Sequence, residues 1–172
     1  MDLRLKSRLS KIKTLIFDVD GVFTDATIIV TDTEVLRTFN VRDGYALQMC
    51  IKAGYKTAVI SGGKQESIRT RLGGLGIPEI HLCVSTDGKP QVLDDLMEKW
   101  QLEEEEVLYI GDDIPDLLLM QNRKIFKACP ADAEPEVLAE ADYVCQKNGG
   151  AGAVREVIEL VMKTQNTWLK QF

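Results

Sequence analysis

Seven side chains able to do chemistry stand where predicted buried strands end or where a predicted helix begins. In chain order they are Asp18, Asp20, Ser61, Lys89, Asp112, Asp113 and Asp116. In an open α/β sheet, ligands bind outside the carboxyl ends of the strands. We therefore expect one site that gathers several carboxylates, one hydroxyl and one ammonium.

Carboxylates that share a partly desolvated site repel one another, so this cluster needs a cation. All-oxygen ligands favour a hard ion, and few protein ligands with room for waters and a phosphate indicate Mg²⁺. A calcium loop would need an acidic or Asn ligand at position 22 and Glu near position 29, where the chain has Val22 and Ile29. The sequence therefore predicts a magnesium site.

Each of these motifs, taken alone, also has an ordinary structural interpretation. The Asp18 to Gly21 segment could form only a turn, and so could Ser61-Gly62. Asp112 and Asp113 could cap a helix, and Lys89 alone would be a solvated lysine. The joint order of Asp-x-Asp, Ser, Lys and Gly-Asp-Asp-x-x-Asp, each at a strand end or a helix start, favours catalysis.

The composition excludes several other classes of protein. The 172 residues are 45% hydrophobic and 28% charged, which suits a globular chain with a sizeable core. The net charge of −6 argues against a nucleic-acid partner, which binds basic surfaces. No apolar run is long enough for a membrane span, and no apolar signal segment follows the basic first residues. We expect a cytoplasmic protein with no nucleic-acid or membrane partner.

The four cysteines and the single histidine narrow the chemistry further. The cysteines form no CxxC pair, so a zinc site is not expected, and they suit the reduced thiols of a cytosolic protein. His81 lies in the apolar stretch Ile80-His81-Leu82. We give it a structural role and expect no Ser-His-Asp or Cys-His mechanism.

Short apolar runs alternate with helix-length amphipathic segments. Strands are predicted at 12–17, 27–30, 35–40, 56–60, 79–84, 107–110, 124–129 and 142–145. Helices are predicted at 43–53, 64–75, 90–100, 114–121 and 151–162. This alternation predicts the α/β class, with a Rossmann-like parallel sheet, helices on both faces and a short β-hairpin insertion at about 24–40. We expect a single domain over residues 1–172, with a tail at about 163–172.

Over nearly its whole length the chain resembles the haloacid dehalogenase superfamily of phosphotransferases. DVDGVFTD (residues 18–25) is similar to the first superfamily motif, Ser61 to the second, Lys89 to the third and GDDIPD (residues 111–116) to the fourth. The 43 positions from Asp18 to Ser61 and the 28 from Ser61 to Lys89 are already occupied by predicted elements. Neither interval has room for a cap domain, so the resemblance is to a capless phosphatase.

Three further stretches are similar to the family of 3-deoxy-D-manno-octulosonate 8-phosphate phosphatases. They are FNVRDGY (39–45), GIPEIHL (76–82) and GGAGAVREVIEL (149–160). The resemblance implies an Mg²⁺-dependent phosphomonoesterase that releases phosphate and the free eight-carbon sugar acid, in the synthesis of lipopolysaccharide precursors.

The resemblance also implies a role for each motif residue. Asp18 would be the nucleophile that forms an aspartyl-phosphate. Asp20 would protonate the leaving sugar oxygen and then activate water. Asp18, the main-chain carbonyl of Asp20 and Asp112 would hold Mg²⁺.

The other motif residues would assist. Ser61 would donate a hydrogen bond to the phosphoryl oxygens, and Lys89 would supply a positive charge to the phosphoryl group and the nucleophile. Asp113 and Asp116 would orient metal-bound waters.

The sugar acid would be bound by a second group of residues. In the resembled family one short segment lines the substrate site, together with the positions of Asp20 and Lys89. In this chain the segment consists of Asn40, Val41, Arg42, Asp43 and Gly44. Arg42 and Arg71 are candidates for binding the carboxylate, because a guanidinium fits that planar group. Gly63, Gln48 and Ala151 stand where the family often has a basic residue, which leaves the identity of the sugar acid open.

Three alternatives remain at this point. The first is a phosphatase of a nine-carbon keto-deoxy sugar acid 9-phosphate, as in sialic-acid-type pathways. The second is a receiver-like phosphorylation module, although Asp20 suits turnover better than storage of phosphate. The third is a non-catalytic assembly subunit, which the intact motifs disfavour.

We also expect a homo-oligomer, most simply a homotetramer, as the resemblance implies. The hairpin carries apolar residues on both faces, which pairing with neighbouring copies would bury. Trp168, Leu169 and Phe172 are candidate anchors for a tail that reaches a neighbouring site.

Overall fold

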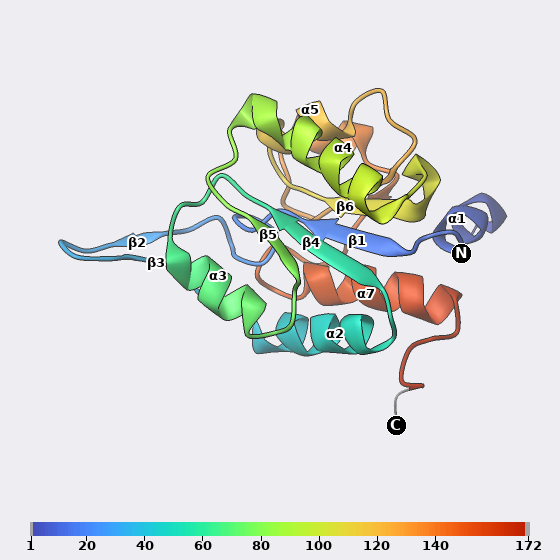
Figure 1. Cartoon of the computed structure of the whole chain (residues 1–172), viewed down its shortest axis with the longest axis horizontal. Coiled ribbons are helices and arrows are strands. Elements are labelled where there is room, and N and C mark those ends of the chain that lie inside the picture. Colours follow the sequence, from blue (N-terminus) through green and yellow to red (C-terminus); the bar gives the residue numbers. More distant parts are fainter. Residues whose placement is uncertain (1, 171–172) are drawn as a thin grey trace.

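A six-stranded parallel sheet forms the centre of the fold, in the order β5-β4-β1-β6-β7-β8 (Figure 1). This computed structural model describes residues 2–170. The strands are β1 (Thr14–Phe17), β4 (Lys56–Ile60), β5 (Glu79–His81), β6 (Val107–Ile110), β7 (Phe126–Cys129) and β8 (Tyr143–Val144). Phe17 at the end of β1 pairs with Val59 on one side and Ile110 on the other. The carboxyl ends of β1, β4 and β6 therefore meet at one edge of the sheet.

Helices cover both faces of the sheet, as predicted (Figure 1). On one face lie α2 (Val41–Lys52), α3 (Glu66–Gly73) and α7 (Ala153–Thr164), with α1 (Leu3–Leu9) beside α7. On the other lie α4 (Lys89–Trp100), α5 (Ile114–Met120) and α6 (Pro135–Glu140). Side chains alternate along β1, so Leu15 and Phe17 enter the first core and Ile16 enters the second.

Several element boundaries differ from the sequence-based expectation. Helices α1 and α6 were not predicted, because six or seven residues give too short a window for a helical repeat. The predicted strand 35–40 ends at Leu36, and Asn40 instead caps α2 by accepting a hydrogen bond from the Arg42 amide. Short 3₁₀ turns at Thr86–Gly88 and Glu104–Glu106 precede α4 and β6.

The hairpin insertion protrudes from the domain next to the start of α3 (Figure 1). Its strands β2 (Ile29–Val30) and β3 (Val35–Leu36) pair antiparallel. They have two residues each and are shorter than the predicted strands 27–30 and 35–40. Within residues 2–170 the hairpin is the only element between β1 and α2, so a cap domain is absent there, as expected.

The tail turns back onto its own chain. The Trp168 ring packs at the edge of the first core, and the Arg155 guanidinium lies 5.6 Å from its centroid. Leu169 is exposed, and Phe172 lies outside the described residues. Among residues 2–170, no helix has both the length and the apolar composition needed to cross a membrane.

Candidate active site

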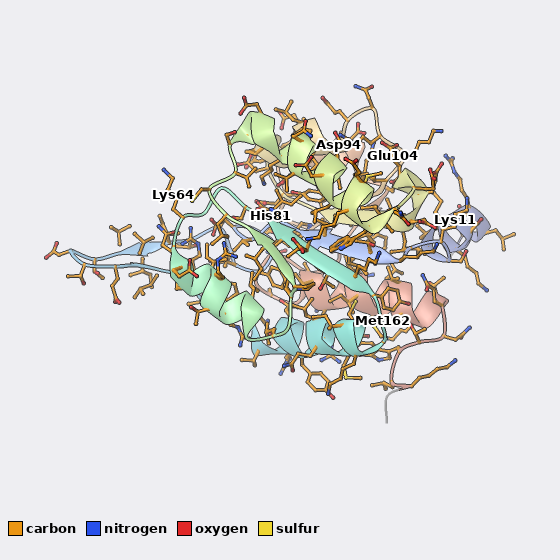
Figure 2. All side chains as sticks on the ribbon, in the orientation of Figure 1. Lys11, Lys64, His81, Asp94, Glu104 and Met162 are labelled. Carbon is orange, nitrogen blue, oxygen red and sulfur yellow. The ribbon has the colours of Figure 1, made fainter. Side chains whose placement is uncertain are left out.

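One cavity of about 320 Å³ at the carboxyl edge of the sheet brings the predicted motif residues together. All seven line it, namely Asp18, Asp20, Ser61, Lys89, Asp112, Asp113 and Asp116. His81 lies on the edge strand β5 (Figure 2) and is not among the lining residues that the structure describes. The spacing of the motifs along the chain thus predicted their convergence.

Three carboxylates in this cavity form a group suited to a cation. Asp18, Asp112 and Asp116 each offer an oxygen, and these oxygens lie within 4.8 Å of one another. Oδ1 of Asp112 is buried without a hydrogen-bond partner among the described residues. Oδ1 of Asp18 is also buried, and its ionic contact is Lys89 Nζ at 3.3 Å. Buried carboxylate oxygens left open in this way fit a hard divalent ion.

The electrostatics of the cavity support the same interpretation. Burial, and then repulsion from Asp116, raises the pKa of Asp18 well above its usual value, with Lys89 acting in the opposite direction. Burial and the neighbouring carboxylates of Asp116 and Asp113 raise the pKa of Asp112 to about 7. A divalent cation would offset this repulsion and keep both groups ionised at neutral pH.

Asp116 accepts four hydrogen bonds from protein donors. Its Oδ1 accepts hydrogen bonds from Lys89 Nζ at 2.7 Å and from the buried Tyr109 hydroxyl at 2.5 Å. Its Oδ2 accepts from the amides of Asp112 and Asp113 at 3.0 and 3.3 Å. These contacts fix the loop after β6 and the position of Lys89, and the expected role of Asp116 in orienting metal-bound waters stays a prediction.

Lys89 lies between two carboxylates at the first position of α4. Its side chain is 3% exposed. Burial disfavours its charge, yet the adjacent Asp18 and Asp116 outweigh burial and raise the pKa of Lys89. The raised pKa keeps Lys89 positively charged at neutral pH, and its ammonium faces Asp18.

Ser61 and Asp113 occupy the ends of other elements. Ser61 is buried at the end of β4, and its Oγ accepts a hydrogen bond from the Gly63 amide at 3.1 Å. The hydroxyl proton of Ser61 remains available to an anion in the cavity. Asp113 is exposed and caps α5, since its Oδ1 accepts from the Ile114 amide at 2.7 Å.

Arg37 is a site residue that the sequence reasoning missed. It follows β3 of the hairpin, and its guanidinium donates to both carboxylate oxygens of Asp20, at 2.6 and 2.9 Å. Its third nitrogen donates to Oε1 of Gln65 at 2.7 Å. No spacing motif predicts this pair, because only the fold of the hairpin brings the two residues together.

The predicted sugar-binding residues do not line the same cavity. Arg42 and Asn40 line a separate cavity of about 650 Å³ between α2 and α7, and Val41 is 74% exposed. Asp43 is fully buried, and its Oδ1 accepts a hydrogen bond from the Arg155 amide at 2.9 Å, so it caps α7. Burial raises the pKa of Asp43 despite that bond.

Arg71 is also placed away from the cavity that the seven motif residues line. Its guanidinium lies over Gly44, where a Cβ would approach within 2.7 Å of Nη2. Arg71 and Gly44 thus form a packing contact between α3 and α2. Within this chain, the structure does not bring the 40–44 segment or Arg71 to the motif residues.

Comparison with known proteins agrees with the geometry. The model of the haloacid dehalogenase-like hydrolase family matches residues 40–122. The 3-deoxy-D-manno-octulosonate 8-phosphate phosphatases KdsC of Salmonella typhi and of Escherichia coli K12 are each 38% identical over 160 residues, which are 92% of this chain and 84% of theirs.

Solved structures show the same relationship. The Yersinia pestis 3-deoxy-D-manno-octulosonate 8-phosphate phosphatase matches with a TM-score of 0.92 and 35% identity, over 97% of this chain and 89% of that one. The Moraxella catarrhalis enzyme, in complex with magnesium, phosphate and KDO, matches with a TM-score of 0.90 and 34% identity, over 96% and 94%. The chain therefore belongs to the 3-deoxy-D-manno-octulosonate 8-phosphate phosphatase family of haloacid dehalogenase-like hydrolases.

Proposed function

We propose that this protein is an Mg²⁺-dependent phosphatase that hydrolyses 3-deoxy-D-manno-octulosonate 8-phosphate to the free sugar acid and phosphate. The observation that carries the proposal is the convergence of Asp18, Asp20, Lys89 and Asp112 on one cavity. The Moraxella catarrhalis relative, 34% identical, is described with magnesium, phosphate and KDO.

In the first half of the reaction, a carboxylate oxygen of Asp18 attacks phosphorus in line and the P–O bond to the sugar breaks. Asp20 gives a proton to the departing sugar oxygen, so the sugar acid leaves as a neutral alcohol at that carbon. Lys89 and the Ser61 hydroxyl hold the phosphoryl oxygens and offset their growing negative charge.

In the second half, water attacks the phosphorus of the Asp18 aspartyl-phosphate. Asp20, now ionised, takes a proton from that water, the bond between phosphorus and Asp18 breaks, and phosphate leaves. Asp20 ends with a proton and Asp18 as a carboxylate, so both are ready for another turnover.

The carboxylates of Asp18 and Asp112, with the main-chain carbonyl of Asp20, would hold Mg²⁺, and Asp113 and Asp116 would orient its waters. When bound, the ion supplies positive charge that neutralises the phosphate and the acidic cluster. Asp116 fixes this arrangement through Lys89 and the amides of Asp112 and Asp113.

We also propose a homotetramer, in which sugar recognition depends on neighbouring copies. The hairpin exposes Ile28, Ile29, Val30 and Leu36 by 40 to 67%. Exposed apolar side chains on a two-stranded ribbon favour burial in an interface. Arg42 would then bind the sugar carboxylate in the assembled enzyme, although it lies outside the phosphate cavity of its own chain.

A cytoplasmic location is part of the proposal. All four cysteines are unpaired, and three of them are buried, as expected in a reducing compartment. Fractionation of cells that produce the protein tests this directly.

The main test measures phosphate release from the eight-carbon 8-phosphate and from a nine-carbon keto-deoxy sugar acid 9-phosphate, with and without Mg²⁺. We expect kcat/KM to be highest for the eight-carbon substrate and activity to be lost with chelator. A higher kcat/KM on the nine-carbon substrate would show that the nine-carbon compound, and not the eight-carbon one, is the substrate. A single turnover without continued release of phosphate would indicate a receiver-like module.

A further inference from the structure

Asp20 is held by a side chain from outside the motif loops. Nε and Nη2 of Arg37 donate to Oδ1 and Oδ2 of Asp20, at 2.6 and 2.9 Å. This fork-to-fork geometry fixes both the position and the plane of the carboxylate, which a single hydrogen bond would not. The Arg37 side chain is only 7% exposed, so the pair is not an ordinary surface ion pair.

The guanidinium is itself held in place. Nη1 of Arg37 donates to Oε1 of Gln65, the residue that precedes α3. The guanidinium also lies beside Gly63, where a Cβ would be 3.6 Å from Nη2 of Arg37, an ordinary contact distance. The Asp20 carboxylate and the loop after β4 are thus joined through one arginine of the hairpin.

The pair leaves Asp20 able to react. The Asp20 side chain is 37% exposed and lines the phosphate cavity. Each carboxylate oxygen has two acceptor sites, and Arg37 uses one on each oxygen. The remaining site on either oxygen is free to meet the substrate.

We propose that Arg37 is a positioning residue for the acid–base step, holding the Asp20 carboxyl at the leaving-group oxygen. The proposal rests on the proposed function, in which Asp20 protonates that oxygen. It also gives the hairpin a role in the chemistry, because Arg37 directly follows β3.

The leaving group provides a test that a purely structural role would not satisfy. Aryl phosphates of similar shape but different phenol acidity need different amounts of help from a general acid. The quantity to measure is kcat/KM, which reports the steps up to loss of the leaving group. General acid catalysis contributes about 10²–10⁴-fold to the rate. A variant with a misplaced acid should therefore lose much kcat/KM on phenyl phosphate and little on p-nitrophenyl phosphate.

We expect R37A to lower kcat/KM for phenyl phosphate about 10- to 100-fold more than for p-nitrophenyl phosphate, as part of the general-acid contribution. R37K, which keeps the positive charge but has a single donor nitrogen, should recover part of the loss. Millimolar methylguanidinium should recover activity in R37A but not in D20N. The matched control is K64A, which removes an exposed cation from the loop between β4 and α3, with its side chain directed away from the ribbon (Figure 2).

The outcomes separate the two proposals. If D20N does not steepen the leaving-group dependence, the assignment of Asp20 as the acid fails. Another outcome is that D20N steepens the leaving-group dependence while R37A does not, although the melting temperature shows that R37A is folded. In that case the positioning role of Arg37 fails and the proposed function stands. Equal effects of K64A and R37A would mean that Arg37 acts only through its charge, which would overturn the proposal. A shallower dependence of kcat/KM on the leaving group in R37A would overturn it too.

Discussion

Gly21 lies directly against Asp112, and a Cβ on residue 21 would fall 1.9 Å from Oδ2 of that aspartate. Gly21 also has a φ of +80°, which favours glycine. The loop after β1 can therefore approach the acidic loop after β6 only because residue 21 has no side chain. This contact places the main chain beside Asp20 next to a proposed metal ligand.

We expect Gly21→Ala to lower kcat/KM by more than about 100-fold, because a displacement near 1 Å can cost that much in rate. The control is Gly54→Ala, which has a similar φ of +91° but no atom within 4 Å of the added Cβ. Equal losses in both variants would mean that backbone strain, and not contact with Asp112, causes the effect. Steady-state kinetics and Mg²⁺ titration distinguish the two.

Asp18→Asn should abolish turnover while it preserves the fold. The amide keeps the shape but is not a nucleophile, and we expect a loss of at least thousands-fold, on the order seen for nucleophile removal. Burial and repulsion from Asp116 raise the pKa of Asp18, so its ionised form destabilises the metal-free protein. The melting temperature of the metal-free variant should therefore equal or exceed that of the wild type, and a variant with a tenth of wild-type activity would refute the assignment.

Lys89→Met should be strongly destabilising in the absence of metal. Lys89 is the cation between Asp18 and Asp116, and removal of one partner from a buried ion pair costs about 3–5 kcal/mol. Urea unfolding with and without Mg²⁺ measures this loss. The control is Lys99→Met in the same helix. The Lys99 side chain is 57% exposed and pairs with Glu79, so its loss should lower the free energy of unfolding by less than about 1 kcal/mol.

Binding of Mg²⁺ should weaken as the pH falls below 7. The pKa of Asp112 in the metal-free protein is about 7, so below that pH a proton competes with the ion. If one proton is displaced, the Kd should rise about tenfold for each pH unit. Calorimetry in buffers of different ionisation enthalpy measures the protons released, and a Kd independent of pH between 5.5 and 7 would contradict this assignment.

The same pKa predicts the pH dependence of stability without metal. The folded protein binds the Asp112 proton more tightly than the unfolded chain, whose carboxyl has the ordinary value near 3.8. The corresponding stabilisation is complete below about pH 4 and is lost as the pH rises through 7. Saturating Mg²⁺ should remove most of this loss, which thermal unfolding across that range will show.

The sequence was sufficient to predict that the motif residues converge on one cavity, but not which residues support them. Asp18, Ser61 and Asp112 could be placed because each follows a strand of one parallel sheet, where topology dictates convergence. Arg37 could not be placed, since its contact with Asp20 depends on the path of an irregular hairpin. Asp43 is predicted to line the substrate site, and that role stays a prediction; the structure adds that Asp43 is buried and accepts a hydrogen bond from the Arg155 amide in the first turn of α7.

Ile29→Asp should dissociate the proposed homotetramer. The Ile29 side chain is 54% exposed on β2, across from Leu36, so a carboxylate there costs little in the monomer but would be desolvated in an interface. Thr33→Asp at the exposed turn of the same hairpin is the control and should leave the assembly intact. Sedimentation equilibrium at micromolar concentration gives the mass of each variant, against a chain mass of 19.2 kDa.

Dissociation should affect the sugar phosphate more than a small ester. The phosphate cavity is built from residues of one chain, so p-nitrophenyl phosphate needs no neighbour, whereas the proposed sugar contact of Arg42 requires the assembled enzyme. We expect Ile29→Asp to lower kcat/KM for the sugar phosphate at least about tenfold more than for p-nitrophenyl phosphate, a difference of about 1.4 kcal/mol. A wild-type mass near one chain with full activity would refute the oligomer, and equal losses on both substrates would instead mean that the substitution displaces Arg37 and Asp20 within the chain.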